Sequence, residues 1–227
     1  MELMLDTIEL DTIELDKIAL YNECLNISGV TSNPSIIKKH GKVNIESHMK
    51  EIRKIIGPEK SLHIQVVGVS SEDMIADARK IINEIDQNAY VKIPTTTEGL
   101  KAMKELKKEG FNVTATAIYS IFQGLMAINV GADYIAPYFN RMENMGVNSL
   151  EVLTHLQSEI DQSKSETKIL AASFKNSKQV VEALSTGAKS VTIGTEIIEE
   201  NLGTAAVNQA VIDFNQDWFS LYNKNSI

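Results

Sequence analysis

A lysine stands inside an apolar segment, in "AYVKIP", where Lys92 lies between Val91 and Ile93 and Pro94 closes the run. Lysine is among the residues least often buried, because an ammonium in apolar surroundings costs free energy. Many such lysines extend their stem along the core and keep the charged head in water. Alternatively, desolvation by Val91 and Ile93, with a nearby cation such as Arg141, lowers the pKa of the amine and frees it as a nucleophile.

Polar side chains also stand where the other short β-patterned segments end. They are Asp6, Thr31, Ser32, Asn33, Gln65, Thr116, Tyr138, Arg141, Ser173 and Lys175. A neutral lysine attacks a ketone to form a Schiff base, which accepts electrons while a neighbouring carbon–carbon bond breaks. Asp6 is suited to handling a proton or hydroxyl, and Tyr138 to acting through a bound water. Arg141, Lys175 and Ser173 are suited to holding a phosphate.

Each of these residues also has an ordinary structural interpretation. Asp6 fits a cap for the following segment, and the Asn33–Pro34 pair is a common turn signal. Tyr138 and Gln65 fit core positions at which the polar atoms are hydrogen-bonded. Only the common placement of the residues at strand ends favours a site.

The elements that would position these residues alternate along the whole chain. The expected strands span 2–6, 27–31, 62–67, 89–94, 112–117, 133–138, 168–173 and 190–194. The helical patterns span 11–25, 43–56, 71–86, 97–108, 119–130, 148–162, 177–186 and 195–201. Ser71 and Thr97 are the expected capping residues of two of them.

Eight βα units predict the α/β class and a closed (β/α)₈ TIM barrel, in which all the strand ends meet at one mouth. A doubly wound open sheet is the alternative, but the first βα turn lacks a G-x-G-x-x-G motif. No linker divides residues 1–227, so we expect one domain. An extra amphipathic helix at about 204–223 either closes the barrel bottom or docks on a neighbouring subunit.

Composition excludes several other functions. A formal net charge of −8 argues against nucleic-acid or anionic-membrane partners. No apolar run approaches the ~20 residues of a membrane span, and the acidic start is unlike a secretory signal. The single cysteine, Cys24, predicts a reducing, cytoplasmic location, and no partner base near it suggests a catalytic thiol.

Metal and cofactor chemistry is not expected. The histidines are scattered and lack metal-ligand spacing; they are His40, His48, His63 and His155. There is also no G-x-S-x-G elbow for Ser/His/Asp catalysis. The sequence therefore predicts a reaction that needs neither a metal nor a cofactor.

Five motifs resemble the small transaldolase family, and most closely its fructose-6-phosphate aldolase branch. They are "GVTSNPSII", "VKIPTTTEGLKA", "TAIYSIFQGL", "GADYIAPYFNR" and "LAASFK". The resemblance covers essentially the whole chain. It implies a barrel enzyme with a class I aldolase mechanism, and a homo-oligomer of pentameric rings that pair into decamers.

The resemblance also implies a role for each site residue. Lys92 matches the Schiff-base lysine and Asp6 the essential carboxylate. The positions around the dihydroxyacetone moiety are Thr31 and Asn33. The group that holds the catalytic water is Gln65, Thr116 and Tyr138. The phosphate site is Arg141, Ser173 and Lys175.

Two positions distinguish the branches of this family. Transaldolases typically carry Glu at the position of Gln65 and Phe at that of Tyr138. A tyrosine hydroxyl helps to protonate and hydrolyse the enamine, so we expect reversible cleavage of fructose 6-phosphate to dihydroxyacetone and glyceraldehyde 3-phosphate. The alternatives are a transaldolase of the pentose phosphate pathway, which uses erythrose 4-phosphate as acceptor, and a catalytically silent sugar-phosphate binder.

The chain departs from the family pattern in three places. Ser32 stands where the family often has Thr. The segment "SVTIGTEII" lacks the proline that is usual after strand eight, and "FNRMENMGVNS" differs beyond Arg141. These departures concern loop shape and acceptor preference, and not the Schiff base.

Overall fold

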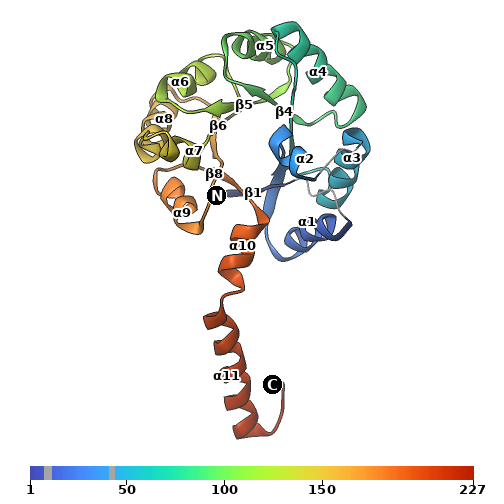
Figure 1. The fold of residues 1–227 in the computed structure, drawn as a ribbon, viewed down its shortest axis with the longest axis vertical. Coiled ribbons are helices and arrows are strands. Elements are labelled where there is room, and N and C mark those ends of the chain that lie inside the picture. The colour runs from blue at the N-terminus through green and yellow to red at the C-terminus, as the bar shows by residue number, and fades with distance from the viewer. Residues whose placement is uncertain (8–11, 41–43) are drawn as a thin grey trace.

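The computed structural model describes residues 1–7, 12–40 and 44–227. Eight parallel strands form a closed barrel in which each strand pairs with the next and β8 pairs back with β1. They are β1 (Glu2–Asp6), β2 (Ile27–Thr31), β3 (Ser61–Gln65), β4 (Tyr90–Pro94), β5 (Asn112–Ile118), β6 (Tyr134–Pro137), β7 (Lys168–Ala171) and β8 (Ser190–Ile193). The helices surround the strands (Figure 1). The predicted (β/α)₈ barrel is confirmed, and the open-sheet alternative is wrong.

The helices follow the expected pattern, with two additions. They are α1 (Thr12–Cys24), α2 (Pro34–His40), α3 (Ile45–Ile56), α4 (Ser71–Glu84), α5 (Thr97–Lys108), α6 (Ile121–Asn129), α7 (Phe139–Asn144), α8 (Ser149–Ser163), α9 (Ser177–Ser185), α10 (Thr195–Leu202) and α11 (Ala205–Tyr222). The short helices α2 and α7 were not predicted. Asn33–Pro34 starts α2 because proline suits the first helical position and Asn33 Oδ1 accepts from the amides of Ser35 and Ile36.

Two predicted capping residues are each wrong by one position. Ser70, and not Ser71, caps α4 by accepting a hydrogen bond from the amide of Asp73. Thr96, and not Thr97, caps α5 by accepting from the amide of Gly99. In both cases the residue before the helix has the extended backbone that lets its oxygen face the third amide.

Alternation along the strands decides what the barrel encloses. Val91 and Ile93 belong to the apolar layer between β4 and the helices, where both are fully buried. Tyr90 and Lys92 alternate with them, so their side chains lie inside the barrel. A buried lysine is thus a consequence of an ordinary strand pattern.

The C-terminal helix α11 extends away from the barrel (Figure 1). None of its residues is buried, and Val211, Phe214 and Phe219 are 53%, 70% and 47% exposed. It therefore does not close the barrel bottom. Among the described residues, no helix combines the length and the hydrophobicity needed to cross a membrane.

Candidate active site

Lys92 lies near the C-terminal end of β4 with only 2% of its surface exposed. Burial lowers the pKa of its amine, and the nearby Asp6 carboxylate opposes that shift. The predicted cause is only partly right. Val91 and Ile93 point away from the amine, so the barrel interior itself desolvates it. The charge that acts on Lys92 is Asp6, whereas Arg141 lies over the ring of Tyr138, 4.8 Å from its centroid.

Asp6 ends β1, level with Thr31 on the neighbouring strand β2. The Thr31 hydroxyl donates to Asp6 Oδ1 over 2.8 Å. The same hydroxyl lies 2.7 Å from Oγ1 of Thr192, on β8. Thr192 was not predicted as a site residue, because threonine is a common residue in β-strands.

Thr116 and Tyr138 come together at the ends of β5 and β6, with 2.9 Å between their hydroxyl oxygens. Burial raises the pKa of Tyr138 more than the Thr116 hydroxyl and Arg141 lower it, so its phenol stays protonated at neutral pH. Ala117, next to Thr116, has a φ of 58°. Strained backbone of this kind costs about 1–3 kcal/mol and concentrates at functional sites.

Gln65 lies level with Lys92 on the adjacent strand β3. Its amide oxygen is buried and accepts no hydrogen bond from any residue in the described part of the chain. An unsatisfied buried acceptor costs about 1–3 kcal/mol. A hydrogen bond from a bound water or a substrate group would remove this cost. Gln65 is therefore placed beside the amine with hydrogen-bonding capacity to spare.

The interior beneath Lys92 is also polar. His63 is fully buried, with Nδ1 2.8 Å from Thr114 Oγ1 and Nε2 3.0 Å from Ser61 Oγ. Its ring stacks on Tyr90 at 4.6 Å. Burial, and then the charge of Lys92, hold the pKa of His63 well below its usual value. His63 is therefore neutral and adds no positive charge beneath the amine.

A cavity of about 340 Å³ opens at the barrel mouth. Seven of the ten predicted site residues line it: Asp6, Asn33, Lys92, Tyr138, Arg141, Ser173 and Lys175. The other three, Thr31, Gln65 and Thr116, do not line it; Thr31 and Thr116 contact lining residues, and Gln65 lies on the strand next to Lys92. The structure thus brings the predicted lysine and carboxylate into one cavity with two cations.

The cationic end of this cavity is suited to an anion. Arg141 donates to the Tyr119 hydroxyl over 3.3 Å, and neither Arg141 nor Lys175 forms an ion pair with a carboxylate in the described part of the chain. Ser173 has a φ of 64°, and its carbonyl accepts from the amide of Asn140, which fixes this turn after β7. One unpredicted carboxylate, that of Glu196, also lines the cavity.

Glu196 lies against Gly194, the residue that follows β8. A Cβ atom at Gly194 would lie 2.2 Å from Glu196 Oε2, so a larger residue there would displace this carboxylate. Glu196 was not among the predicted site residues. The rim of the cavity is therefore less positive than the two cations alone suggest.

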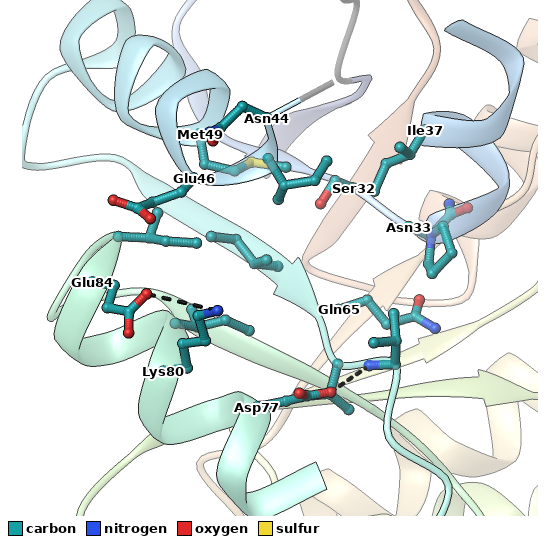
Figure 2. A pocket seen from close by; sticks show the side chains of 17 residues that line it. Ser32, Asn33, Ile37, Asn44, Glu46, Met49, Gln65, Asp77, Lys80 and Glu84 are labelled. Carbon is teal, nitrogen blue, oxygen red and sulfur yellow. Dashed lines mark hydrogen bonds and ion pairs between the residues drawn. The ribbon is translucent and has the colours of Figure 1, made fainter. Parts of the chain in front are cut away.

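A second cavity, of about 440 Å³, lies beside the mouth between α2, α3, α4 and β3 (Figure 2). It shares Asn33 with the first cavity and has Gln65 at its edge. Most of its wall is apolar. Asp77 accepts from the amides of Val67 and Gly68, so that carboxylate is used to fix the loop after β3. The residues suited to covalent chemistry line the first cavity.

A closed (β/α)₈ barrel whose mouth holds a buried lysine beside a carboxylate is typical of barrel enzymes with their active site at the C-terminal ends of the strands. The family model described as Transaldolase/Fructose-6-phosphate aldolase matches residues 4–224. A protein of Streptococcus pneumoniae named probable fructose-6-phosphate aldolase is 46% identical over 227 residues, 100% of both chains. The chain belongs to the transaldolase/fructose-6-phosphate aldolase family and is an enzyme of the aldolase or transaldolase type.

Among solved structures, a flavocytochrome b2 variant superposes with a TM-score of 0.55 over 85% of this chain and 56% of that chain. The two sequences are 14% identical. This likeness concerns the barrel fold alone.

Proposed function

We propose that the protein is a class I aldolase that reversibly cleaves fructose 6-phosphate to dihydroxyacetone and glyceraldehyde 3-phosphate. The observation that carries the proposal is the buried amine of Lys92, whose pKa is lowered, beside Asp6 in a cavity that also contains Arg141 and Lys175. A lowered pKa increases the neutral fraction of the amine, and only the neutral amine is nucleophilic.

The proposed reaction begins when Nζ of Lys92 attacks the C2 ketone. Loss of water from the carbinolamine gives an iminium ion. Asp6 then accepts the proton of the C4 hydroxyl, and the aldehyde product leaves as the C3–C4 bond breaks. The C3–C4 electron pair forms the C2=C3 double bond of an enamine, while the electrons of the C=N double bond return to nitrogen. The enamine that remains takes a proton at C3, and water adds at C2 to release dihydroxyacetone and the amine.

The last step requires a held water and a proton donor. The protonated hydroxyl of Tyr138, the hydroxyl of Thr116 and the unsatisfied amide oxygen of Gln65 support this role. Asn33 and Thr31 lie on the side of Asp6 and are assigned to the dihydroxyacetone moiety. Arg141, Lys175 and Ser173 are assigned to the phosphate, since charged donors bind phosphate oxygens strongly.

A transaldolase is the second candidate, because the matched family description covers both activities. The two reactions share every step up to the enamine. A buried phenol that stays protonated favours discharge of the enamine to water, and hence the aldolase.

The test is to incubate the protein with fructose 6-phosphate and to measure glyceraldehyde 3-phosphate with and without erythrose 4-phosphate. Comparable release in both supports the aldolase. Release only with the acceptor indicates the transaldolase. In parallel, borohydride should trap the dihydroxyacetone unit on Lys92; a Lys92→Met variant that still gains the adduct mass would refute the assignment.

We also propose that α11 docks on a second copy of the chain, as part of a pentamer or decamer in the cytoplasm. Its apolar side chains are exposed along its length, and it extends from the barrel without burying any residue. Exposed apolar surface of this extent marks an interaction site. Near the end of the helix, the rings of Trp218 and Tyr222 lie in tilted contact, with their centroids 4.2 Å apart.

A further inference from the structure

Three side chains from three neighbouring strands meet at the carboxylate of the site. β1 pairs with β2 on one side and with β8 on the other. Thr31 comes from β2 and Thr192 from β8, and their hydroxyl oxygens meet at 2.7 Å on the inner face of the barrel. Both threonines are buried, and Thr31 also contacts Asp6 Oδ1 at 2.8 Å.

The direction of these hydrogen bonds follows from counting protons. An ionised carboxylate only accepts, so the single hydroxyl proton of Thr31 points to Asp6. Thr31 has no second proton, so Thr192 is the donor in the contact between the two threonines. The result is one directed chain, from Thr192 to Thr31 to Asp6. Hydrogen bonds in such a chain polarise and strengthen one another in a buried setting.

We propose that Thr192 is a positioning residue that acts through Thr31 to hold the Asp6 carboxylate in its working orientation. The inference rests on the proposed function, in which Asp6 accepts the C4 hydroxyl proton beside Lys92. Without Thr192, the Thr31 hydroxyl loses the donor that fixes its rotor and is able to turn away from the carboxylate. Asp6 then loses the hydrogen bond that Thr31 donates to its Oδ1.

The expected effect is on the proton-transfer step rather than on substrate binding. A small misplacement of a catalytic group costs up to about 10²-fold in rate, so we expect Thr192→Val to lower kcat for cleavage roughly 10-fold. Thr192 also lines the cavity, so a direct contact with the substrate would raise KM as well as lower kcat. A positioning role predicts a change in kcat with little change in KM. Thr31→Val removes the direct contact and should lower kcat further.

The test uses two substitutions of opposite character. Thr192→Val keeps the shape and removes the hydroxyl, whereas Thr192→Ser keeps the hydroxyl and removes the methyl group. We expect the serine variant to recover most of the kcat lost in the valine variant. If Thr192 served packing alone, valine would retain kcat and serine would lose it together with thermal stability, which would overturn the proposal.

Ser190→Ala provides a matched control. Ser190 lies on the same strand and the same face, is fully buried, and donates to Glu2 at the opposite end of the barrel over 3.1 Å. Its hydroxyl should be dispensable for cleavage. A loss of kcat equal to that of Thr192→Val would mean that any lost hydroxyl on β8 has this effect, and the proposal would be wrong.

A double-mutant cycle tests whether the residues act as one chain. If they do, Thr31→Val combined with Thr192→Val should be no slower than Thr31→Val alone, since the chain is already broken. Fully additive losses would contradict the proposal. Borohydride trapping on the wild type distinguishes a failure of the proposed function from a failure of this inference. If no adduct forms on Lys92, the proposed function is wrong and this inference falls with it. If the adduct forms and Thr192→Val has the kcat of the wild type, the inference alone is wrong.

Discussion

The hydroxyl oxygen of Tyr138 lies 2.9 Å from that of Thr116, across the ends of β5 and β6. Because burial raises the pKa of the phenol, Tyr138 is a proton donor and not an anion across the neutral range. In the proposed function, this pair serves the discharge of the enamine, which is the step that separates an aldolase from a transaldolase.

Replacing Tyr138 with Phe should therefore change the partition of the enamine. We expect Tyr138→Phe to lower the release of glyceraldehyde 3-phosphate in the absence of an acceptor by about 10²-fold, the lower end of general-acid effects. Transfer to erythrose 4-phosphate should fall much less, since it needs no water. Coupled assays with and without erythrose 4-phosphate measure both rates, and equal losses in the two assays would contradict this role.

The convergence of this site could be predicted because a closed parallel barrel brings all C-terminal strand ends to one mouth. Once the segments that carry Asp6, Lys92 and Tyr138 are assigned as strands, their meeting requires no further information. The position of the strands came from alternation and from turn residues, which are local signals.

Other features depend on contacts that local patterns do not encode. Thr192 matters only because β8 closes against β1, which brings it to Thr31. The predicted cap of α4 was wrong by one position because Ser70 and Ser71 carry the same hydroxyl group, and only the backbone conformation distinguishes them. The predicted charge near Lys92 was a cation, whereas the charge that acts on it is the Asp6 carboxylate. This difference depends on distances across the barrel, which local patterns do not encode.

The lowered pKa of Lys92 predicts a pH dependence with a definite sign. The nucleophilic amine increases as pH rises through that pKa, which lies below the ordinary value of about 10.4. Activity should therefore rise at a lower pH than an ordinary lysine amine would allow. Since the Asp6 carboxylate raises the pKa of Lys92, Asp6→Asn should move the rise to still lower pH. The rate at which pyridoxal phosphate and borohydride label Lys92 measures this shift without requiring turnover; a shift to higher pH would contradict it.

Arg141 and Lys175 should determine the preference for phosphorylated aldehydes. We expect Arg141→Ala and Lys175→Ala each to raise KM for glyceraldehyde 3-phosphate about 10-fold in the synthetic direction, the effect of losing one charged hydrogen bond. KM for unphosphorylated glyceraldehyde should stay within about twofold. Lys178→Ala is the control, because Lys178 is exposed and paired with Glu182 on α9. Equal changes for both aldehydes would show that these cations do not bind the phosphate.

Lys92 should also affect stability in a pH-dependent way. Between its lowered folded pKa and about 10.4, the unfolded chain holds a proton that the folded chain has released, so wild-type stability rises with pH across that window. Lys92→Met lacks this contribution. We expect the free energy of unfolding of the wild type, relative to that of the variant, to increase between pH 7 and pH 10. Urea titrations at the two pH values test it, and parallel curves would exclude an amine with a lowered pKa.

The exposed apolar side chains of α11 should control association. Phe214 is 70% exposed and Val211, one turn earlier, is 53% exposed, although an isolated helix gains nothing from presenting them to water. A glutamate at Phe214 would place a charge in any contact that buries this face, which costs several kcal/mol when the charge is unpaired. We therefore expect Phe214→Glu to sediment as a smaller species than the wild type at equal concentration. Asn208→Glu is the control for added charge, because Asn208 is exposed in the first turn of the same helix, where a carboxylate is favourable. If Phe214→Glu and the wild type sediment alike, α11 does not hold the copies together.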